Sequence, residues 1–287
     1  MAKVLVTGSS TGIGLATVVH LARNGHDVFA TMRNPAGAHE LQETVRSEAL
    51  PVTVLPLDVD SDASVQATFD TVLAHSGRLD VLVNNAGIGF SGAVEDVPLS
   101  EFRQVMETNY FGALRCIKAV LPSMRHKGSG RIVNITSVAG RMAGAAQGAY
   151  AASKWALEAL SETLAQEVAR FGIRVTIIEP GVITTPIFGK MGVSPAATPY
   201  PHQRRLASLF AKSNETPRSP FIVAEKIAEV IGNGDATLRH TVGPDAAGIL
   251  GWRRSMSDEE WVAFGGLDDR AWSERVSRDF SLDIRLS

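Results

Sequence analysis

A tyrosine and a lysine at four-residue spacing are the pair in this sequence best suited to move a proton. Tyr150 and Lys154 begin a long stretch of helical pattern, so both side chains lie on one face, one turn apart. A free tyrosine has a pKa of about 10, too high for a base at neutral pH, but a neighbouring cation lowers that pKa by stabilising the phenolate. The pair could therefore take a proton from an alcohol or give one to a carbonyl oxygen. A surface Tyr/Lys pair is the common alternative, and this spacing alone does not decide between them.

A glycine-rich turn near the N-terminus is the second chemical feature. Thr7-Gly8-Ser9-Ser10-Thr11-Gly12-Ile13-Gly14 follows the first expected strand and opens the first expected helix. The glycines let backbone N–H groups approach a pyrophosphate, and the helix N-terminus adds partial positive charge. An ordinary glycine turn is the alternative, but the position between strand and helix favours dinucleotide binding. The residues expected to bind the dinucleotide here are Gly8, Ser10, Thr11, Gly12, Ile13 and Gly14.

The same turn also matches a hydrolase motif. Gly8-Ser9-Ser10-Thr11-Gly12 fits the Gly-x-Ser-x-Gly elbow, which exposes a serine nucleophile on a strand-to-helix turn. It follows the very first strand, however, and Gly14 extends it to the phosphate-loop spacing. We therefore favour a phosphate-binding role for Ser10 over a nucleophilic one.

The order of motifs resembles the short-chain dehydrogenase/reductase family, in its branch of single-domain enzymes. The Thr-Gly-x-x-x-Gly-x-Gly spacing carries this resemblance, with Asp58 after the third expected strand, Asn84-Asn85-Ala86-Gly87 at the end of the fourth and Pro180-Gly181 after the sixth. The match covers about residues 3–190. It implies that an alcohol and a carbonyl compound are interconverted with a nicotinamide cofactor. Hydride would pass to or from nicotinamide C4 while Tyr150 moves the proton, and the positive charge of the oxidised nicotinamide would act with Lys154 to lower the pKa of Tyr150.

The resemblance also implies a catalytic set of four residues. Ser137, thirteen residues before Tyr150, matches the family's substrate-polarising serine, whose hydroxyl would stabilise charge on the same substrate oxygen. Asn109 matches the helix asparagine that holds a water against Lys154 and completes a proton path to solvent. A turn serine and a polar helix residue are the alternatives. Because all four residues occur in order, we expect Ser137, Tyr150, Lys154 and Asn109 to be catalytic.

Further cofactor contacts are implied by the same resemblance. Asp58 and Val59 match positions that contact the adenine. The turn of Asn84, Asn85, Ala86 and Gly87 would support the adenosine side, and Ile183 and Thr185, after Pro180 and Gly181, match positions that hold the nicotinamide carboxamide. Tyr150 and Lys154 complete the expected set.

The end of the second expected strand indicates which nicotinamide cofactor is used. NAD-dependent members of the family usually place an acid at the position of Met32, where it would bind the adenosine ribose. Here that position is apolar, and Arg33 follows it. A guanidinium matches the geometry of a phosphate, so we expect NADP(H), with Arg33 and Ser10 at the 2′-phosphate. A solvated loop cation is the alternative for Arg33.

The elements that position these residues alternate between strand and helix patterns. The expected strands are Lys3–Thr7, Asp27–Met32, Val52–Leu57, Asp80–Asn84, Arg131–Thr136, Arg174–Glu179 and Leu238–Val242, and the expected helices include Ile13–Asn24, Ser61–Ser76, Ser100–Met124 and Tyr150–Phe171. Near-continuous apolar runs are typical of strands buried on both faces of a parallel sheet. We therefore expect one α/β domain spanning residues 1–287, with a Rossmann-type, doubly wound, seven-stranded parallel sheet and helices on both faces.

Two C-terminal segments break this rhythm. Residues 186–220 are punctuated by Pro186, Pro195, Pro199, Pro201, Pro217 and Pro220 and show no strand rhythm. We expect an irregular lid or pocket wall there, with a mobile surface loop as the alternative. Together with residues 138–147, this segment would form the wall of the substrate pocket. The apolar residues expected in that wall are Met142, Ile187, Phe188, Met191, Leu209 and Phe210, although most of them could equally be core residues. Residues 245–287 should form one or two short helices, whose tryptophans pack onto the body or onto another subunit.

Composition narrows the class of protein. The net charge is −2 and there is no long run of like charge, which gives no argument for a nucleic-acid partner. The single cysteine, Cys116, excludes a disulfide within the chain, and we expect it to be a packing residue. The seven histidines show no metal-binding pattern. With no signal-peptide pattern and no apolar run long enough to span a membrane, we expect a cytoplasmic protein without metal or membrane span.

The leading hypothesis is an NADP(H)-dependent oxidoreductase for a small hydrophobic alcohol or carbonyl compound. Residues 109–185 look most like members that include hydroxysteroid and retinol dehydrogenases. Two alternatives stay open: a 3-oxoacyl-thioester reductase, which uses the same catalytic set, and a regulator that binds NADP(H) without chemistry. Family members often form dimers or tetramers through the helices that carry Asn109 and Tyr150, so we expect a homodimer or homotetramer. Since NADPH is usually the abundant form, carbonyl reduction is the preferred direction.

Overall fold

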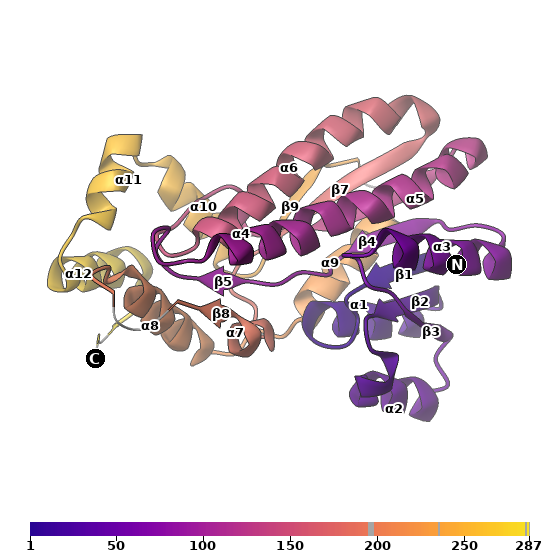
Figure 1. The fold of residues 1–287 in the computed structure, drawn as a ribbon, viewed down its shortest axis with the longest axis horizontal. Helices are drawn as coiled ribbons and strands as arrows, with labels where there is room; N and C mark the ends of the chain where they lie inside the picture. The colour runs from indigo at the N-terminus through magenta and orange to yellow at the C-terminus, as the bar shows by residue number, and fades with distance from the viewer. Residues whose placement is uncertain (195–197, 235, 285, 287) are drawn as a thin grey trace.

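A seven-stranded parallel sheet forms the centre of the molecule (Figure 1). The structure is a computed structural model, and it describes residues 1–194, 198–234, 236–284 and 286. The strands lie in the order β3-β2-β1-β4-β6-β7-β9, and every neighbouring pair is parallel. They are β1 (Lys3–Thr7), β2 (Asp27–Met32), β3 (Val52–Pro56), β4 (Val81–Asn84), β6 (Gly130–Ile135), β7 (Ile173–Pro180) and β9 (Arg239–Val242). The expected doubly wound fold is confirmed.

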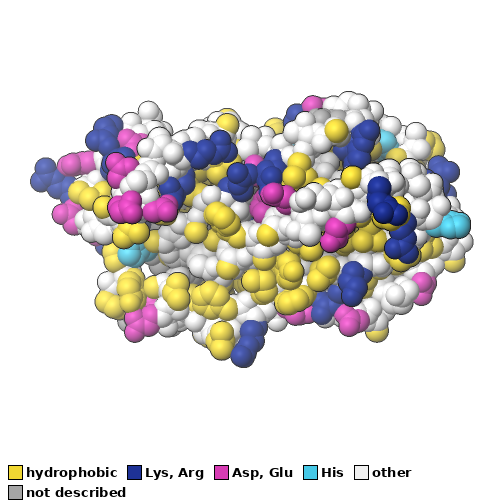
Figure 2. Space-filling view, turned by 90° about the horizontal axis from the view of Figure 1, so that it is seen from above, with side chains coloured by type: hydrophobic (Ala, Val, Ile, Leu, Met, Phe, Trp, Pro, Cys, Tyr) yellow, Lys and Arg dark blue, Asp and Glu magenta, His cyan; other side chains and the backbone are white. Residues whose placement is uncertain are grey.

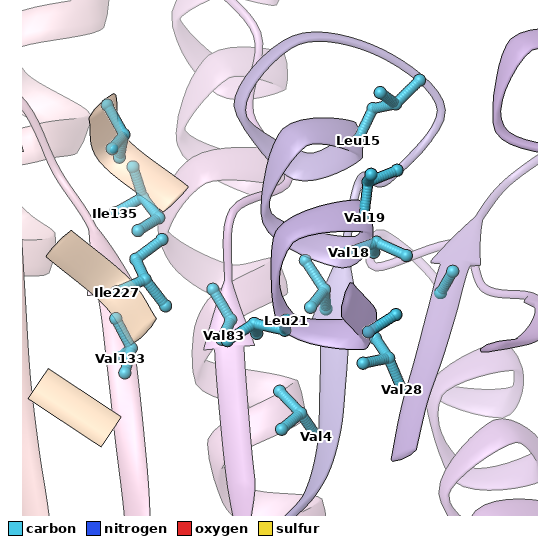
Figure 3. Close-up of a cluster of buried hydrophobic side chains, with 14 of the residues drawn as sticks. Val4, Leu15, Val18, Val19, Leu21, Val28, Val83, Val133, Ile135 and Ile227 are labelled. Atoms are coloured by element: carbon cyan, nitrogen blue, oxygen red, sulfur yellow. The ribbon is translucent and has the colours of Figure 1, made fainter. Parts of the chain in front are cut away.

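Helices cover both faces of the sheet. One face carries α1 (Gly12–Arg23), α2 (His39–Ser47) and α9 (Phe221–Gly232), and the other carries α3 (Asp62–Ser76), α5 (Gly112–Lys127) and α6 (Gly148–Val168). Successive side chains of β1 point to opposite faces of the sheet. Val4 and Val6 therefore pack in the hydrophobic cluster on one face, and Leu5 packs in the cluster on the other. Figure 3 shows the first cluster, where Val18 and Val19 of α1 lie against the sheet near Val28.

The expected helix Ser100–Met124 is divided in the structure. It consists of α4 (Leu99–Met106), a π-helical turn (Glu107–Phe111) and α5. The turn carries Asn109, whose side chain is 1% exposed and bonds to the main chain of Ile88. Such bulges often occur at functional sites, and a hydrophobic pattern does not reveal them.

The expectation of an irregular segment at 186–220 is wrong. The segment holds α7 (Ile187–Lys190), β8 (Gly192–Val193) and the long helix α8 (His202–Asn214), and β8 pairs with β5 (Phe90–Ser91). Pro186, Pro201 and Pro220 stand directly before α7, α8 and α9. At a helix start the missing N–H of proline costs nothing, so these prolines begin helices. Pro195 lies outside the described residues.

The tail has three helices where one or two were expected. They are α10 (Ala246–Arg254), α11 (Asp258–Gly265) and α12 (Asp269–Phe280). Ser257 and Glu260 form a capping box at the start of α11, and Asp268 accepts from the N–H of Ala271 at the start of α12. The tail lies beside α8 at one end of the molecule (Figure 1).

Candidate active site

A cleft of about 640 Å³ opens at the carboxyl ends of the central strands. In parallel α/β sheets this edge is where ligands bind. Most of the expected site residues line the cleft: Gly8, Ser10, Thr11, Gly12, Ile13, Arg33, Asp58, Val59, Asn85, Ala86, Gly87, Ser137, Tyr150, Lys154, Pro180, Gly181, Ile183 and Thr185. The fold thus brings together segments from most of the length of the chain.

Three expected residues do not line the cleft but lie behind it. Asn84 is buried and donates to Oδ1 of Asn134 on the neighbouring strand at 2.8 Å. Gly14 packs against the glycine turn, where an added Cβ would lie 2.3 Å from the carbonyl oxygen of Gly8. Asn109, the third, is 1% exposed and lies behind Gly87.

The phosphate-loop end of the cleft consists of residues 8–13 together with Arg33 and Asp58. Gly8 and Gly12 have φ of +67° and +61°, a conformation that side chains with a Cβ rarely adopt. The N-terminus of α1 has no side-chain cap from Thr11 and no acidic residue in its first turn. Its free N–H groups and dipole therefore suit an anion. The residues present fit the diphosphate of a dinucleotide.

Asn85 and Thr7 hold this turn in place. Asn85 Nδ2 donates to the carbonyl oxygens of Thr7 and Gly8 at 2.9 and 3.0 Å, and Thr7 Oγ1 accepts from the N–H groups of Asn85 and Ala86, both at 3.0 Å. The β1 and β4 loops are thereby locked together. We did not expect this role for Thr7, although its place directly before the glycine turn was visible in the sequence.

Arg33 is exposed at the rim of this end. It lines the cleft with Ser10 and Asn34, and no described carboxylate lies within ion-pair distance of it. Met32 before it is 4% exposed and packs in the first core cluster. The guanidinium is thus available at the cleft, and the residue before it cannot bind ribose hydroxyls.

Tyr150 and Ser137 meet in the middle of the cleft. Both side chains line the cleft, and the Ser137 hydroxyl lies close enough to the Tyr150 phenol to affect its ionisation. The two residues come from different elements, since Ser137 follows β6 and Tyr150 lies in the first turn of α6. Burial raises the pKa of Tyr150, and the Ser137 hydroxyl opposes this rise. A substrate oxygen placed here would therefore meet two hydroxyl groups at once.

Lys154 lies one turn further along α6. Its side chain is almost fully buried, with the residue 5% exposed, and Nζ lies 5.6 Å from the centre of the Tyr150 ring. Nζ donates to the carbonyl oxygen of Ile135 at 2.9 Å. Burial lowers the pKa of Lys154 to about 8, although the negative charge of Glu158 acts to raise it.

The expected lowering of the Tyr150 pKa by Lys154 is not what these residues produce by themselves. Burial dominates at Tyr150 and raises its pKa, because an apolar surrounding disfavours the phenolate. A protonated tyrosine that can donate to a carbonyl oxygen is therefore the favoured form.

Asn109 joins the loop after β4 to helix α6. Its Oδ1 accepts from the N–H of Ile88 at 2.8 Å, and its Nδ2 donates to the Ile88 carbonyl and to Ser153 Oγ, both at 2.9 Å. A Cβ added at Gly87 would lie 3.2 Å from Asn109 Oδ1 and 3.7 Å from Lys154 Nζ. The asparagine therefore lies near the lysine, and its expected role in holding a water stays a prediction.

The lid end of the cleft is apolar. The six residues expected to wall a substrate pocket all line it: Met142, Ile187, Phe188, Met191, Leu209 and Phe210. The rings of Phe188 and Phe210 lie 4.9 Å apart. The sequence missed Leu206 of α8 and Ile249 of α10, because helical periodicity does not tell which face of an isolated helix meets a cleft.

The tail helices back this wall. Leu209 lines the cleft and also packs in the tail cluster with Trp272 and Val276. Arg205, on the adjacent turn of α8, is 3% exposed and donates to Asp269 at 2.8 Å and to the Leu267 carbonyl at 2.7 Å. The expectation that tryptophans of the tail pack onto the body is confirmed for Trp272.

No group of three or more His, Cys, Asp or Glu side chains in the described part of the chain is placed to hold a metal ion. No helix among the residues described is both long and apolar enough to cross a membrane.

On the face shown in Figure 2, Lys and Arg side chains are interspersed with Asp and Glu, and hydrophobic side chains gather in the lower half of the view. Cys116 is fully buried, as expected for a packing residue.

Several known proteins are similar to this chain in sequence and in fold. The model of the short chain dehydrogenase family matches residues 2–194. Bovine retinol dehydrogenase 8 is 39% identical over 251 residues, which cover 82% of this chain and 80% of that protein. A short-chain dehydrogenase structure from Streptomyces avermitilis has a TM-score of 0.81 at 35% identity, covering 96% of this chain and 97% of the other.

A third similar protein was solved with a nicotinamide nucleotide. It is an alcohol dehydrogenase from the archaeon Thermococcus sibiricus in complex with 5-hydroxy-NADP. Its TM-score is 0.70 at 25% identity, and the match covers 84% of this chain and 95% of the other.

Proposed function

The chain belongs to the short-chain dehydrogenase family, and we propose that it interconverts a hydrophobic alcohol and its ketone or aldehyde with NADP(H). The observation that carries the proposal is that one cleft is lined by the glycine turn, by Ser137, Tyr150 and Lys154, and by a mostly apolar wall. A dinucleotide on the glycine turn would have its far end near Tyr150. We also propose that residues 1–287 form one catalytic domain, as the alternation of strands and helices in the sequence predicts.

The proposed mechanism assigns one task to each residue. The nicotinamide would supply or accept the hydride. Tyr150, protonated in its buried position, donates to the carbonyl oxygen during reduction, and Ser137 donates a hydrogen bond to the same oxygen as negative charge develops there. Lys154 places a positive charge beside the tyrosine, which stabilises the phenolate left after the transfer.

The preference for NADP(H) rests on the rim of the phosphate-loop end. Arg33 is exposed, lines the cleft beside Ser10 and is free of ion pairs with the described carboxylates. A 2′-phosphate at this rim would gain a charge-assisted hydrogen bond. The solved alcohol dehydrogenase with bound 5-hydroxy-NADP supports a nicotinamide dinucleotide as the cofactor, and the choice of NADP(H) rests on Arg33 alone.

The preference for a hydrophobic substrate rests on the lid end. Apart from Lys190 of α7, its wall is formed by aliphatic and aromatic side chains of α7, α8 and α10, and a mostly apolar wall with few polar groups is typical of sites for apolar ligands. The similarity to retinol dehydrogenase 8 supports the same class. With NADPH abundant, reduction is the proposed direction.

We also propose a homodimer or homotetramer in the cytoplasm. Phe111 and Trp155, on the helices that carry the candidate catalytic residues, are 42% and 47% exposed. Large apolar side chains at this exposure are suited to contact between subunits.

A substrate panel tests the reaction. NADPH oxidation is measured with steroid ketones, retinals, aromatic aldehydes and 3-oxoacyl thioesters, for the wild type and for Tyr150→Phe. We expect turnover with apolar ketones or aldehydes, and a loss of at least about 10³-fold in the variant with NADPH binding kept. Turnover restricted to thioesters would favour the reductase of lipid synthesis. Tight NADPH binding with no turnover on any compound would favour the regulator.

An arginine substitution tests the cofactor. Arg33→Ala should weaken NADPH binding about 10- to 100-fold, because a charge-assisted hydrogen bond to the phosphate is lost. The dissociation constant of NADH should barely change, and Arg46→Ala on the exposed side of α2 serves as the matched control. Equal losses for NADPH and NADH would refute the assignment.

A further inference from the structure

Five charged side chains that do not line the cleft are joined by ion pairs near the Lys154 turn of α6. Helix α6 contributes two carboxylates, β7 contributes a third, β9 one guanidinium, and the turn after β6 another. This ion cluster consists of Glu158, Glu162, Glu179, Arg239 and Arg141. None of them takes part in the mechanism above.

Glu158 is the central member of the ion cluster. It is 3% exposed, accepts from Thr136 Oγ1 at 2.6 Å through one carboxylate oxygen, and accepts from Arg239 Nε at 2.9 Å through the other. Glu179 is 2% exposed, and its Oε1 lies 3.1 Å from Arg141 Nη1 and 3.8 Å from Arg239 Nε. Two carboxylates are thus held in the interior by hydrogen bonds and ion pairs.

Lys154 and Glu158 are buried, oppositely charged residues on neighbouring turns of α6. Lys154 is 5% exposed and stands one helical turn before Glu158, which is 3% exposed. Their side chains reach adjacent residues at the end of β6, since Lys154 Nζ donates to the Ile135 carbonyl at 2.9 Å and Glu158 accepts from Thr136 Oγ1 at 2.6 Å. Buried charges need compensation nearby, and each of these two residues supplies the opposite charge for the other.

Lys154 has few other sources of compensation. Its ammonium donates to the neutral carbonyl of Ile135, and Gly87 and Asn109 on its cleft side are uncharged. Tyr150 on α6 is the other titratable group beside it, and burial keeps that phenol protonated. Burial lowers the pKa of Lys154, and the charge of Glu158 opposes that fall.

Glu158 is not needed to satisfy Arg239. Glu162, one turn further along α6 and 55% exposed, accepts from Arg239 Nη2 at 2.6 Å. Burial raises the pKa of Glu158, with the charge of Glu179 adding to the rise, while the hydrogen bonds from Thr136 and Arg239 lower it. The net shift of the Glu158 pKa is upward, and the contacts with Thr136 and Arg239 favour its carboxylate form.

We propose that Glu158 is a positioning residue for the reaction, because its carboxylate balances the Lys154 ammonium and keeps that charge beside Tyr150. The inference rests on the proposed function only for the task of Lys154. Its test begins with the chain free of nucleotide, so a failure of the mechanism and a failure of this inference give different results.

The first measurement is the titration of Lys154 by NMR in protein labelled with ¹³C-lysine. Lys154→Met identifies the signal by its loss. In Glu158→Gln, which keeps the shape and the hydrogen-bond acceptor, the midpoint should fall from about 8 to about 7. Glu162→Gln removes a carboxylate bound to the same arginine and should leave the midpoint unchanged. An unchanged midpoint in folded Glu158→Gln would overturn the proposal.

Two further variants guard against a purely structural effect. Glu158→Asp keeps the charge and should restore most of the wild-type midpoint. If Glu158→Gln does not fold, Glu158→Leu removes the charge and fills the same buried place with an apolar side chain, while Arg239 keeps its ion pair with Glu162. Its midpoint should still fall, and a midpoint at the wild-type value refutes the inference.

The second measurement is the pH dependence of carbonyl reduction with NADPH. With a midpoint near 7, Glu158→Gln should equal the wild type at about pH 6 and show a kcat about tenfold lower at about pH 9, with KM unchanged. An equal loss at both pH values would indicate structural damage and contradict the proposal. Should Tyr150→Phe keep full turnover, the proposed mechanism fails while the titration still decides the role of Glu158.

Discussion

The two ends of the cleft are built from different parts of the chain. At the phosphate-loop end the main chain does most of the shaping, with two glycines at positive φ and an uncapped helix N-terminus. At the lid end, side chains from α7, α8 and α10 form the wall, and the tail helices hold α8 in place. A main-chain site tolerates no added atom, whereas a side-chain wall can change its shape and leave the rest of the site intact.

The largest effect should come from the tail. Trp272 is 7% exposed and packs with Leu209 and Val276, and the Arg205 guanidinium lies 5.7 Å from its ring centre. Trp272→Ala should lower the free energy of unfolding by about 3–5 kcal/mol, measured by denaturant unfolding. KM for the carbonyl substrate should rise while the dissociation constant of NADPH stays the same.

A matched control lies on the same tail. Val262→Ala changes a residue of α11 that is 74% exposed and should alter neither stability nor KM. If Trp272→Ala weakened NADPH binding as much as substrate binding, the two ends of the cleft would not be independent.

One methyl group at the phosphate-loop end should come next. Gly14→Ala places a Cβ 2.3 Å from the Gly8 carbonyl oxygen, and such overpacking costs about 1–3 kcal/mol. NADPH and NADH should both bind about 100-fold more weakly, as titration of nucleotide fluorescence would show. Gly251→Ala on α10, where a Cβ meets nothing within 4 Å, should change neither constant; a tolerated alanine at Gly14 would contradict the close packing seen here.

A pH-dependent effect of the tail should be smaller. Asp279 is partly desolvated by burial, but hydrogen bonds from Arg275, Trp252 and Arg278 lower its pKa to about 2. This stability is present above the unfolded pKa of about 4 and is lost as the pH falls through about 2. Asp279→Asn should therefore reduce the free energy of unfolding by about 2 kcal/mol at pH 7. The difference from wild type should shrink below about pH 4, and a constant difference down to pH 2 would exclude this origin.

The smallest effect concerns the choice of substrate. Leu206 lines the lid end from α8, and Leu206→Ala should widen the pocket. Over a series of ketones of increasing size, kcat/KM for the smallest should fall about five- to tenfold, with less loss for the bulkiest, since apolar contacts discriminate by about 1–3 kcal/mol. Ala207→Gly, at the next position of α8, tests whether loosening the helix alone gives the same profile. A uniform loss across the series would speak against Leu206 as part of the wall.

The phosphate-loop end could be predicted from the sequence because its geometry is local. A glycine at positive φ, a strand before it and a helix after it fix the path of the chain within a few residues, and Gly8 and residues 10–13 line the cleft. Ser137 and Tyr150 were found by their distance along the chain. Several of the seven strands were recognised because strands buried on both faces carry near-continuous apolar runs, although β9 (Arg239–Val242) is polar and mostly half-buried.

The lid end could be predicted only in part. The apolar residues of the wall were recognised, but the helix they lie on was not, because the prolines that begin α7 and α8 were taken as signs of irregular chain. Leu206 and Ile249 depend on how α8 and α10 rotate against the tail. The π-helical turn at Asn109 depends on a contact with Ile88, which lies far away in the sequence.

Because Cys116 is buried, the reactivity of its thiol can be used to measure how often the native structure opens. The single thiol is fully covered between α5 and the sheet, and burial raises its pKa to about 12, so alkylating reagents that attack the thiolate find no target in the native state. The rate of alkylation would then follow excursions that expose this layer of the core. For the same reason, a cysteine introduced on the lid or the tail could carry a fluorescent label without background from the rest of the chain.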